Sequence, residues 1–172
     1  MKKVFVSATI ALMLVIVIAG IGLAALPRTE ASGSFMTTST TIHSVTEDKF
    51  NEVIDLSSTV TYSGALEGTS TLQGTLTLRR DGSANFQGVE TFTGLVNGMP
   101  GTLTFKIVGS NDLYQRIQLT NTITSGTGEL ASLRGELSRE GIIKDNGPVG
   151  TFTGRIHKTS KPNVEKEQSD EY

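Results

Sequence analysis

Hydrophobic and polar residues alternate along most of the chain from Thr59 onward. Val60, Tyr62, Gly64 and Leu66 have one parity, and the polar residues Thr59, Thr61, Ser63 and Glu67 have the other. The same alternation recurs in later apolar series: Leu72, Leu76 and Leu78; Phe86 and Phe92; Leu103, Phe105 and Ile107; Ile117, Leu119 and Ile123; Phe152 and Ile156. A period of two residues is typical of strands with one buried face, so the sequence predicts an all-β domain.

Turn signals separate these predicted strands. Asp81-Gly82 and Asn97-Gly98 are dipeptides that favour tight hairpin turns. Short strands joined in this way are typical of an antiparallel barrel or sandwich. Glycine inside a strand often marks a bend or close packing, and repeated inward glycines let a sheet curl until it closes. We therefore expect a small closed antiparallel β-barrel, with these glycines on its apolar face: Gly64, Gly74, Gly88, Gly94 and Gly154.

Two segments depart from the alternation. In residues 46–56, Phe50, Val53 and Ile54 have helical spacing, so this stretch is either a short helix or a loop. Gly126-x-Gly128-x-x-Ala131 matches a loose dinucleotide-binding pattern, but Gly135 interrupts any helix after it and no strand–helix–strand unit surrounds it. We interpret residues 126–135 as a tight turn plus one helical turn across a barrel end, with Leu130 and Leu133 inside.

An apolar segment precedes the predicted barrel. Residues 4–26 carry no charge and follow Lys2 and Lys3. The segment exceeds the roughly 7–15 apolar residues of a signal-peptide core and reaches the about 20 of a spanning helix. The lysines favour a cytoplasmic N-terminus, which places the domain outside the cytoplasm. We predict an exported protein, either anchored in the membrane by this hydrophobic helix or secreted after cleavage near Ala31.

These boundaries give three parts. Residues 1–31 form the signal peptide or membrane anchor, and residues 32–157 form the barrel domain. Residues 158–172 are polar and charged with almost no apolar residues, which is typical of a disordered tail.

Composition excludes several kinds of site. The chain has no cysteine, so a thiol nucleophile and a cysteine-based zinc site are excluded. Its two histidines, His43 and His157, make no recognisable metal spacing, and we expect neither a metal nor a cofactor. A net charge of −2 with scattered basic residues argues against nucleic-acid binding.

Glu90 is the most informative polar residue. Its parity places it on the apolar face between Phe86 and Phe92. A buried carboxylate must pair with a base, accept hydrogen bonds or stay protonated. Such a group either contacts a ligand as a polar or acid–base group or forms a structural ion pair, for which Arg134 and Arg116 are the candidates.

The aromatic residues on the same face define a candidate ligand site. Small barrels are usually filled by side chains, although some hold one small ligand. The aromatic residues are therefore either packed core or the wall of a slot for a small apolar molecule. The candidate ligand-binding residues are Tyr62, Phe86, Glu90, Phe92 and Phe105. No residue is assigned a catalytic role.

Three motifs carry a family resemblance. They are Tyr62-Ser63-Gly64-x-x-Glu67-Gly68, Phe86-x-Gly88-x-Glu90-x-Phe92-x-Gly94, and Ser125-Gly126-Thr127-Gly128-Glu129-Leu130-x-x-Leu133-Arg134-Gly135-Glu136. Over residues 34–156 the chain resembles a domain family of unknown function that is grouped with the allene oxide cyclase-like barrels. The resemblance implies a compact antiparallel barrel, a homo-oligomer that is a trimer, and no cofactor. It implies no reaction.

Three functions are consistent with the sequence. The chain is an extracytoplasmic barrel that binds a small apolar ligand or a partner protein, which is the function we favour. The alternatives are a cofactor-free isomerase or cyclase acting on a lipid-like substrate through Glu90, and a structural envelope protein.

Overall fold

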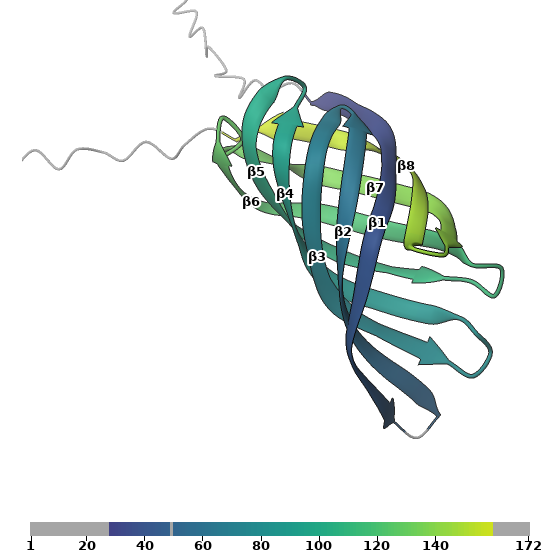
Figure 1. The fold of residues 1–172 in the computed structure, drawn as a ribbon. Helices are drawn as coiled ribbons and strands as arrows, with labels where there is room; N and C mark the ends of the chain where they lie inside the picture. The colour runs from purple at the N-terminus through teal and green to yellow at the C-terminus, as the bar shows by residue number, and fades with distance from the viewer. Residues whose placement is uncertain (1–27, 49, 160–172) are drawn as a thin grey trace, which may run out of the picture.

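The computed structural model describes residues 28–48 and 50–159. They form eight strands in one closed antiparallel barrel, in which each strand pairs with the next and β8 pairs with β1 (Figure 1). The strands are β1 (Thr29–Asp48), β2 (Asn51–Gly64), β3 (Leu66–Arg79), β4 (Ala84–Val96), β5 (Met99–Asn111), β6 (Arg116–Gly128), β7 (Leu133–Lys144) and β8 (Gly147–Lys158). The predicted all-β closed barrel is confirmed.

Both predicted turns are confirmed. Asn97 and Gly98 alone connect β4 to β5, and their φ angles are 48° and 81°. Two positive φ angles are typical of a type I′ hairpin turn, which asparagine and glycine adopt at low cost. Asp81 and Gly82 lie in the loop between β3 and β4.

Residues 46–56 form neither of the predicted structures. They belong to the β1–β2 hairpin, in which Thr46 pairs with Val53 and Val45 pairs with Ile54. The prediction of a short helix or a loop was therefore wrong. The hydrogen bonds of a long hairpin outweigh a helical spacing of three apolar residues, because intrinsic helix propensity is a weak preference that tertiary context overrides.

Gly74 and Gly88 show why glycine occupies the inner face. They are partners in the β3–β4 ladder, and the ring of Phe86 lies over both. A Cβ on Gly88 would lie 2.5 Å from the carbonyl oxygen of Gln73 and 3.0 Å from Cζ of Phe86. The close packing that the inward glycines predicted is present at this pair.

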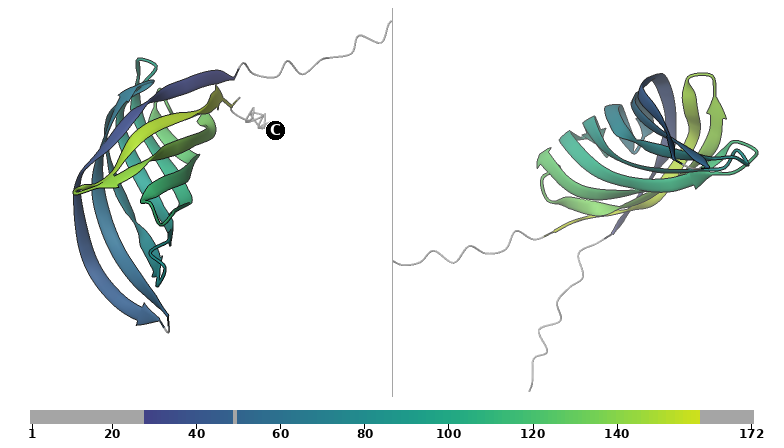
Figure 2. Two further views of the ribbon diagram at one scale, coloured as in Figure 1. Left: turned by 90° about the vertical axis from the view of Figure 1, so that its right-hand side faces the viewer. Right: turned by 90° about the horizontal axis from the view of Figure 1, so that it is seen from below.

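The two ends of the barrel differ. Thr29 at the start of β1 pairs with Ile156 near the end of β8, so both ends of the described chain lie at one end of the barrel (Figure 2). We call this the closed end, because the turn over residues 129–132 covers it and places Leu130 and Leu133 inside. The burial of these two leucines is confirmed, but the segment makes consecutive tight turns instead of a helical turn.

The predicted leader lies largely outside the described residues. Residues 4–26 and most of the predicted tail fall there, and within the described part no helix is long and apolar enough to cross a membrane. The barrel includes residues 29–31, which the sequence prediction placed in the leader, because they pair with β8. Ala31 is buried in the core.

Candidate functional site

The barrel contains a cavity at the end opposite the chain ends. We call this the open end. The hairpin loops β1–β2, β3–β4, β5–β6 and β7–β8 lie there (Figure 1). The cavity has a volume of about 190 Å³ and takes lining residues from all eight strands. They are Thr37, Thr40, Leu56, Ser58, Leu72, Leu76, Phe86, Ser110, Asn111, Ile117, Leu119, Arg139, Ile143, Gly147 and Pro148.

The wall of the cavity is mainly apolar. Leu72, Ile117 and Leu119 are buried, and Phe86 and Ile143 are half-buried. The polar lining residues carry hydroxyl or amide groups, apart from Arg139. An apolar wall with a few polar groups is the usual composition of a small-molecule site.

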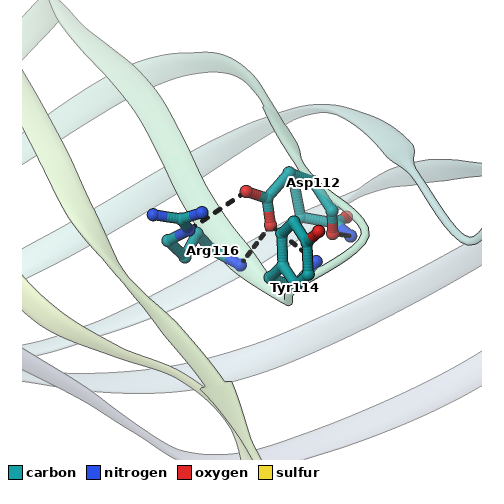
Figure 3. A network of polar contacts seen from close by, with 4 residues as sticks. Asp112, Tyr114 and Arg116 are labelled. Carbon is teal, nitrogen blue, oxygen red and sulfur yellow. Dashed lines mark hydrogen bonds and ion pairs between the residues drawn. The ribbon is translucent and has the colours of Figure 1, made fainter.

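The β5–β6 loop borders the cavity next to Asn111. The carboxylate of Asp112 accepts hydrogen bonds from the backbone N–H groups of Tyr114 and Arg116, at 2.8 and 2.9 Å (Figure 3). Nε of Arg116 donates to the same carboxylate at 3.1 Å. These contacts lower the pKa of Asp112, and the backbone hydrogen bond from Arg116 is the main cause. One side chain therefore sets the shape of this loop.

Arg139 forms the floor of the cavity. It is 1% exposed, and the centre of its guanidinium lies 4.0 Å from the centroid of the Phe35 ring. Its neighbours on the adjacent strands are Leu119, which lines the cavity, and Phe152, which belongs to the packed core. Arg139 therefore lies at the boundary between the cavity and the core.

Glu90 is the partner of Arg139 and lies below the floor. It is fully buried, and Nη1 of Arg139 donates to its Oε2 at 3.0 Å. Asn121 donates to Oε2 at 3.2 Å, and Tyr62 donates to Oε1 at 2.8 Å. Ser70 also donates to Oε1. We call Glu90, Arg139, Tyr62, Ser70 and Asn121 the buried polar cluster.

The predicted partners of Glu90 were wrong. Arg134 donates instead to the carbonyl oxygens of Ala131 and Leu133, and Arg116 pairs with Asp112 at the surface. Parity could have identified Arg139 as an inward-facing candidate, because it follows Leu133 and Leu137 at even spacing on β7. Ser70 and Asn121 were missed as well, although each shares the parity of apolar neighbours on its own strand.

Tyr62 is held as a hydrogen-bond donor. Burial is the main cause that raises the pKa of its phenol well above the ordinary value. The charge of Arg139 opposes this shift, and the charge of Glu90 adds to it. The protonated phenol is the form that can donate to the Glu90 carboxylate.

Two buried atoms of the cluster have no hydrogen-bond partner among the described residues. They are Nε of Arg139 and Oδ1 of Asn121. Most buried polar atoms in proteins are paired, so each exception needs a physical explanation. The unpaired atom of Arg139 belongs to the side chain that forms the cavity floor.

The structure separates the five predicted ligand-binding residues. Phe86 lines the cavity. Tyr62, Glu90, Phe92 and Phe105 are buried and do not line it. Tyr62 packs edge-on against Phe92, with ring centroids 5.7 Å apart. In the described part of the chain, no group of three or more metal-ligating side chains comes together.

Residues 31–149 match the model of a family described as a protein of unknown function, DUF3224. No curated protein sequence matches the chain significantly.

Two solved structures are similar to this barrel. One is a protein of unknown function from the DUF3224 family of Shewanella oneidensis MR-1, which is 19% identical with a TM-score of 0.64. The match covers 78% of this chain and 100% of that chain. The other is the pterocarpan synthase dirigent protein GePTS1, which is 18% identical with a TM-score of 0.47 and is matched over 88% of this chain and 100% of that chain. The first likeness supports the fold alone.

Proposed function

The chain belongs to the DUF3224 family of proteins of unknown function, and we propose that its barrel binds a small, mostly apolar molecule in the cavity at the open end. The family was the one that the sequence motifs predicted. The observation that carries the proposal is the cavity itself, about 190 Å³ in volume and walled mainly by leucine, isoleucine and phenylalanine.

The volume limits the size of the ligand. A dry apolar cavity of about 150 Å³ in another protein is known to hold benzene. A cavity of about 190 Å³ therefore accepts a molecule slightly larger than one aromatic ring. A long fatty acid or a steroid would have to extend out of the cavity through the open end.

Binding is a better-supported function than acid–base catalysis. The lining residues include no carboxylate, and the Glu90 carboxylate lies below the floor with four donors directed at it. A general acid or base must come within hydrogen-bond reach of the reacting atom. Glu90 does not meet this condition for a molecule in the cavity.

We further propose that the protein works outside the cytoplasm, tethered by residues 4–26. The support is the length of this uncharged segment and the two lysines before it. The described chain begins at Arg28, at the closed end, so the open end of a tethered barrel is directed away from its anchor. The ligand then enters from the aqueous phase instead of the bilayer.

The binding proposal is tested with ethylbenzene as the probe. We expect nuclear Overhauser effects between its protons and the methyl groups of Leu72, Ile117 and Leu119 in the full-length protein. Phe86→Trp fills the cavity and should abolish these effects. Val89→Trp is the matched control, because Val89 is an exposed residue on the same strand, and it should leave them intact. Absence of the effects in the wild type, or their persistence in Phe86→Trp, contradicts the proposal.

The tether is tested by membrane fractionation. We expect the full-length protein to stay in the membrane pellet after washes with high salt and with carbonate. Recovery of a protein that begins at residue 32 in the soluble fraction would contradict the anchor and leave export as the remaining conclusion. Such cleavage would also remove Ala31, a buried core residue that pairs with Gly154.

A further inference from the structure

We infer that the ligand carries one uncharged oxygen acceptor and that this oxygen binds to the guanidinium of Arg139 at the cavity floor. The inference rests on the proposed function, because it specifies the chemistry of a molecule in the same cavity. It begins from the unused donors of Arg139.

The guanidinium has more donors than the described residues use. Arginine carries five N–H donors. The structure gives this one a single hydrogen bond, from Nη1 to Oε2 of Glu90. Nε is buried and has no partner among the described residues, and Phe35 covers one face of the group. Because Arg139 lines the cavity, a molecule there can take a hydrogen bond that the described residues leave unmade.

The charge balance favours a neutral acceptor over an anion. Arg139 and Glu90 already form a buried ion pair with no net charge. A ligand carboxylate would add a negative charge close to Glu90 without a second buried cation to compensate it. A carbonyl, ether or hydroxyl oxygen satisfies the donor and adds no charge.

The other lining residues determine the chemistry of the remainder of the ligand. Around Arg139 the cavity is lined by Leu72, Phe86, Ile117 and Leu119, which offer no hydrogen bonds. A second polar group placed against these four side chains would lose its hydration without gaining a partner. The other buried polar groups of the wall are the hydroxyls of Thr37 and Ser58. The ligand class is therefore a compact apolar molecule of about one ring with a single oxygen at one end.

Three probes of similar size separate these chemistries. Acetophenone carries a neutral carbonyl, ethylbenzene carries no acceptor, and benzoate carries a charge. Each is titrated into the full-length protein labelled with ¹⁵N and ¹³C on arginine, at measured free concentrations. The observables are the Nε and Cζ signals of Arg139, which are assigned through their contacts with the Phe35 ring.

We expect acetophenone to shift the Arg139 signals and to bind about tenfold more tightly than ethylbenzene, since one hydrogen bond to a charged group has at least this effect. Benzoate should bind more weakly than acetophenone. Phe86→Trp should abolish the binding of all three probes and the shift of the Arg139 signals. Val89→Trp should leave both unchanged.

Three failures can be distinguished. If acetophenone and ethylbenzene bind equally and leave the Arg139 signals unchanged, the cavity binds apolar molecules but the inference about the oxygen is wrong. Tighter binding of benzoate than of acetophenone overturns the neutral acceptor in favour of an anion. If no probe reaches the methyl groups of the wall, the proposed function itself fails.

Discussion

Nη1 of Arg139 lies 3.0 Å from Oε2 of Glu90, and this contact joins β7 to β4 across the interior of the barrel. The two strands are not neighbours in the sheet, so the ion pair connects walls that no backbone ladder connects. Glu90 has Leu72 and Phe105 as its cross-strand partners, one beside the cavity and one in the core. The pair therefore lies at the boundary between the cavity and the filled interior of the closed end.

Loss of the Glu90 charge should strongly destabilise the fold. We expect Glu90→Gln to lower the free energy of unfolding by about 3–5 kcal/mol, because Arg139 keeps a buried charge with no counterion. The new amide N–H₂ also faces donors from Tyr62, Ser70 or Arg139. Chemical denaturation of both proteins measures the difference.

A double variant and a surface variant provide the controls. Glu90→Gln combined with Arg139→Met removes both charges and should lose less stability than Glu90→Gln alone. Glu140→Gln removes an exposed carboxylate on β7 and should change stability by less than about 0.5 kcal/mol. If the double variant is less stable than the single one, the two charges do not compensate each other.

Tyr62 should make the barrel sensitive to alkali. Its pKa is raised in the folded state, so its contribution to stability is fully present below the unfolded value, about 10, and is lost as the pH rises toward the folded value. Tyr62→Phe removes this titration and one hydrogen bond to a charged group, which costs about 1.5–3 kcal/mol at neutral pH.

The test is the unfolding free energy of both proteins from pH 7 to pH 11. The gap between wild type and Tyr62→Phe should narrow above about pH 10. Tyr114 is an exposed tyrosine, and Tyr114→Phe should leave the alkaline profile of the wild type unchanged. A constant gap between wild type and Tyr62→Phe would show that the phenol does not titrate with folding.

The sequence predicted the barrel because alternation records which face of each strand is buried. Glu90 was placed on the inner face by its parity, and the structure buries it completely. Its pairing with Arg139 was not predicted, because a partner on β7 depends on how the barrel closes. Local parity identifies the inward face of each strand but not which inward residues meet across the interior.

Which of the inward aromatic residues line a cavity was also beyond sequence reasoning. Phe86 and Phe92 share a face and a residue type, yet only Phe86 lines the cavity. Phe92 lies toward the closed end, where Leu130 from the 129–132 turn fills the interior. An inward aromatic residue packs in the core or lines the cavity depending on what covers its end of the barrel. The alternation of apolar and polar residues does not encode that covering.

Asp112 should make the β5–β6 loop sensitive to acid. Its pKa is lowered in the folded state, mainly by the backbone N–H of Arg116, so its contribution to stability is present above the unfolded value, about 3.8, and is lost as the pH falls through the folded value. Asp112→Asn loses the charge and should lower the midpoint temperature of thermal unfolding at neutral pH. The midpoints of the two proteins should converge as the pH falls from 5 to 2. Glu129→Gln, at an exposed site in the turn at the closed end, is the control that should not show this convergence.

Gly88 should be required for the position of the Phe86 ring. A Cβ at this site would lie 2.5 Å from the carbonyl oxygen of Gln73 and 3.0 Å from Cζ of Phe86, so both must move in Gly88→Ala. We expect a loss of about 1–3 kcal/mol of unfolding free energy, as overpacking of a filled interior usually gives.

The same change should weaken ligand binding, because a displaced Phe86 ring enters the cavity that it lines. Titration with ethylbenzene measures this effect, and Gln87→Ala at the neighbouring exposed position is the matched control. Gln87→Ala should leave both stability and ethylbenzene binding near the wild-type values. If Gly88→Ala loses stability but binds ethylbenzene as the wild type does, the ring of Phe86 does not shape the cavity.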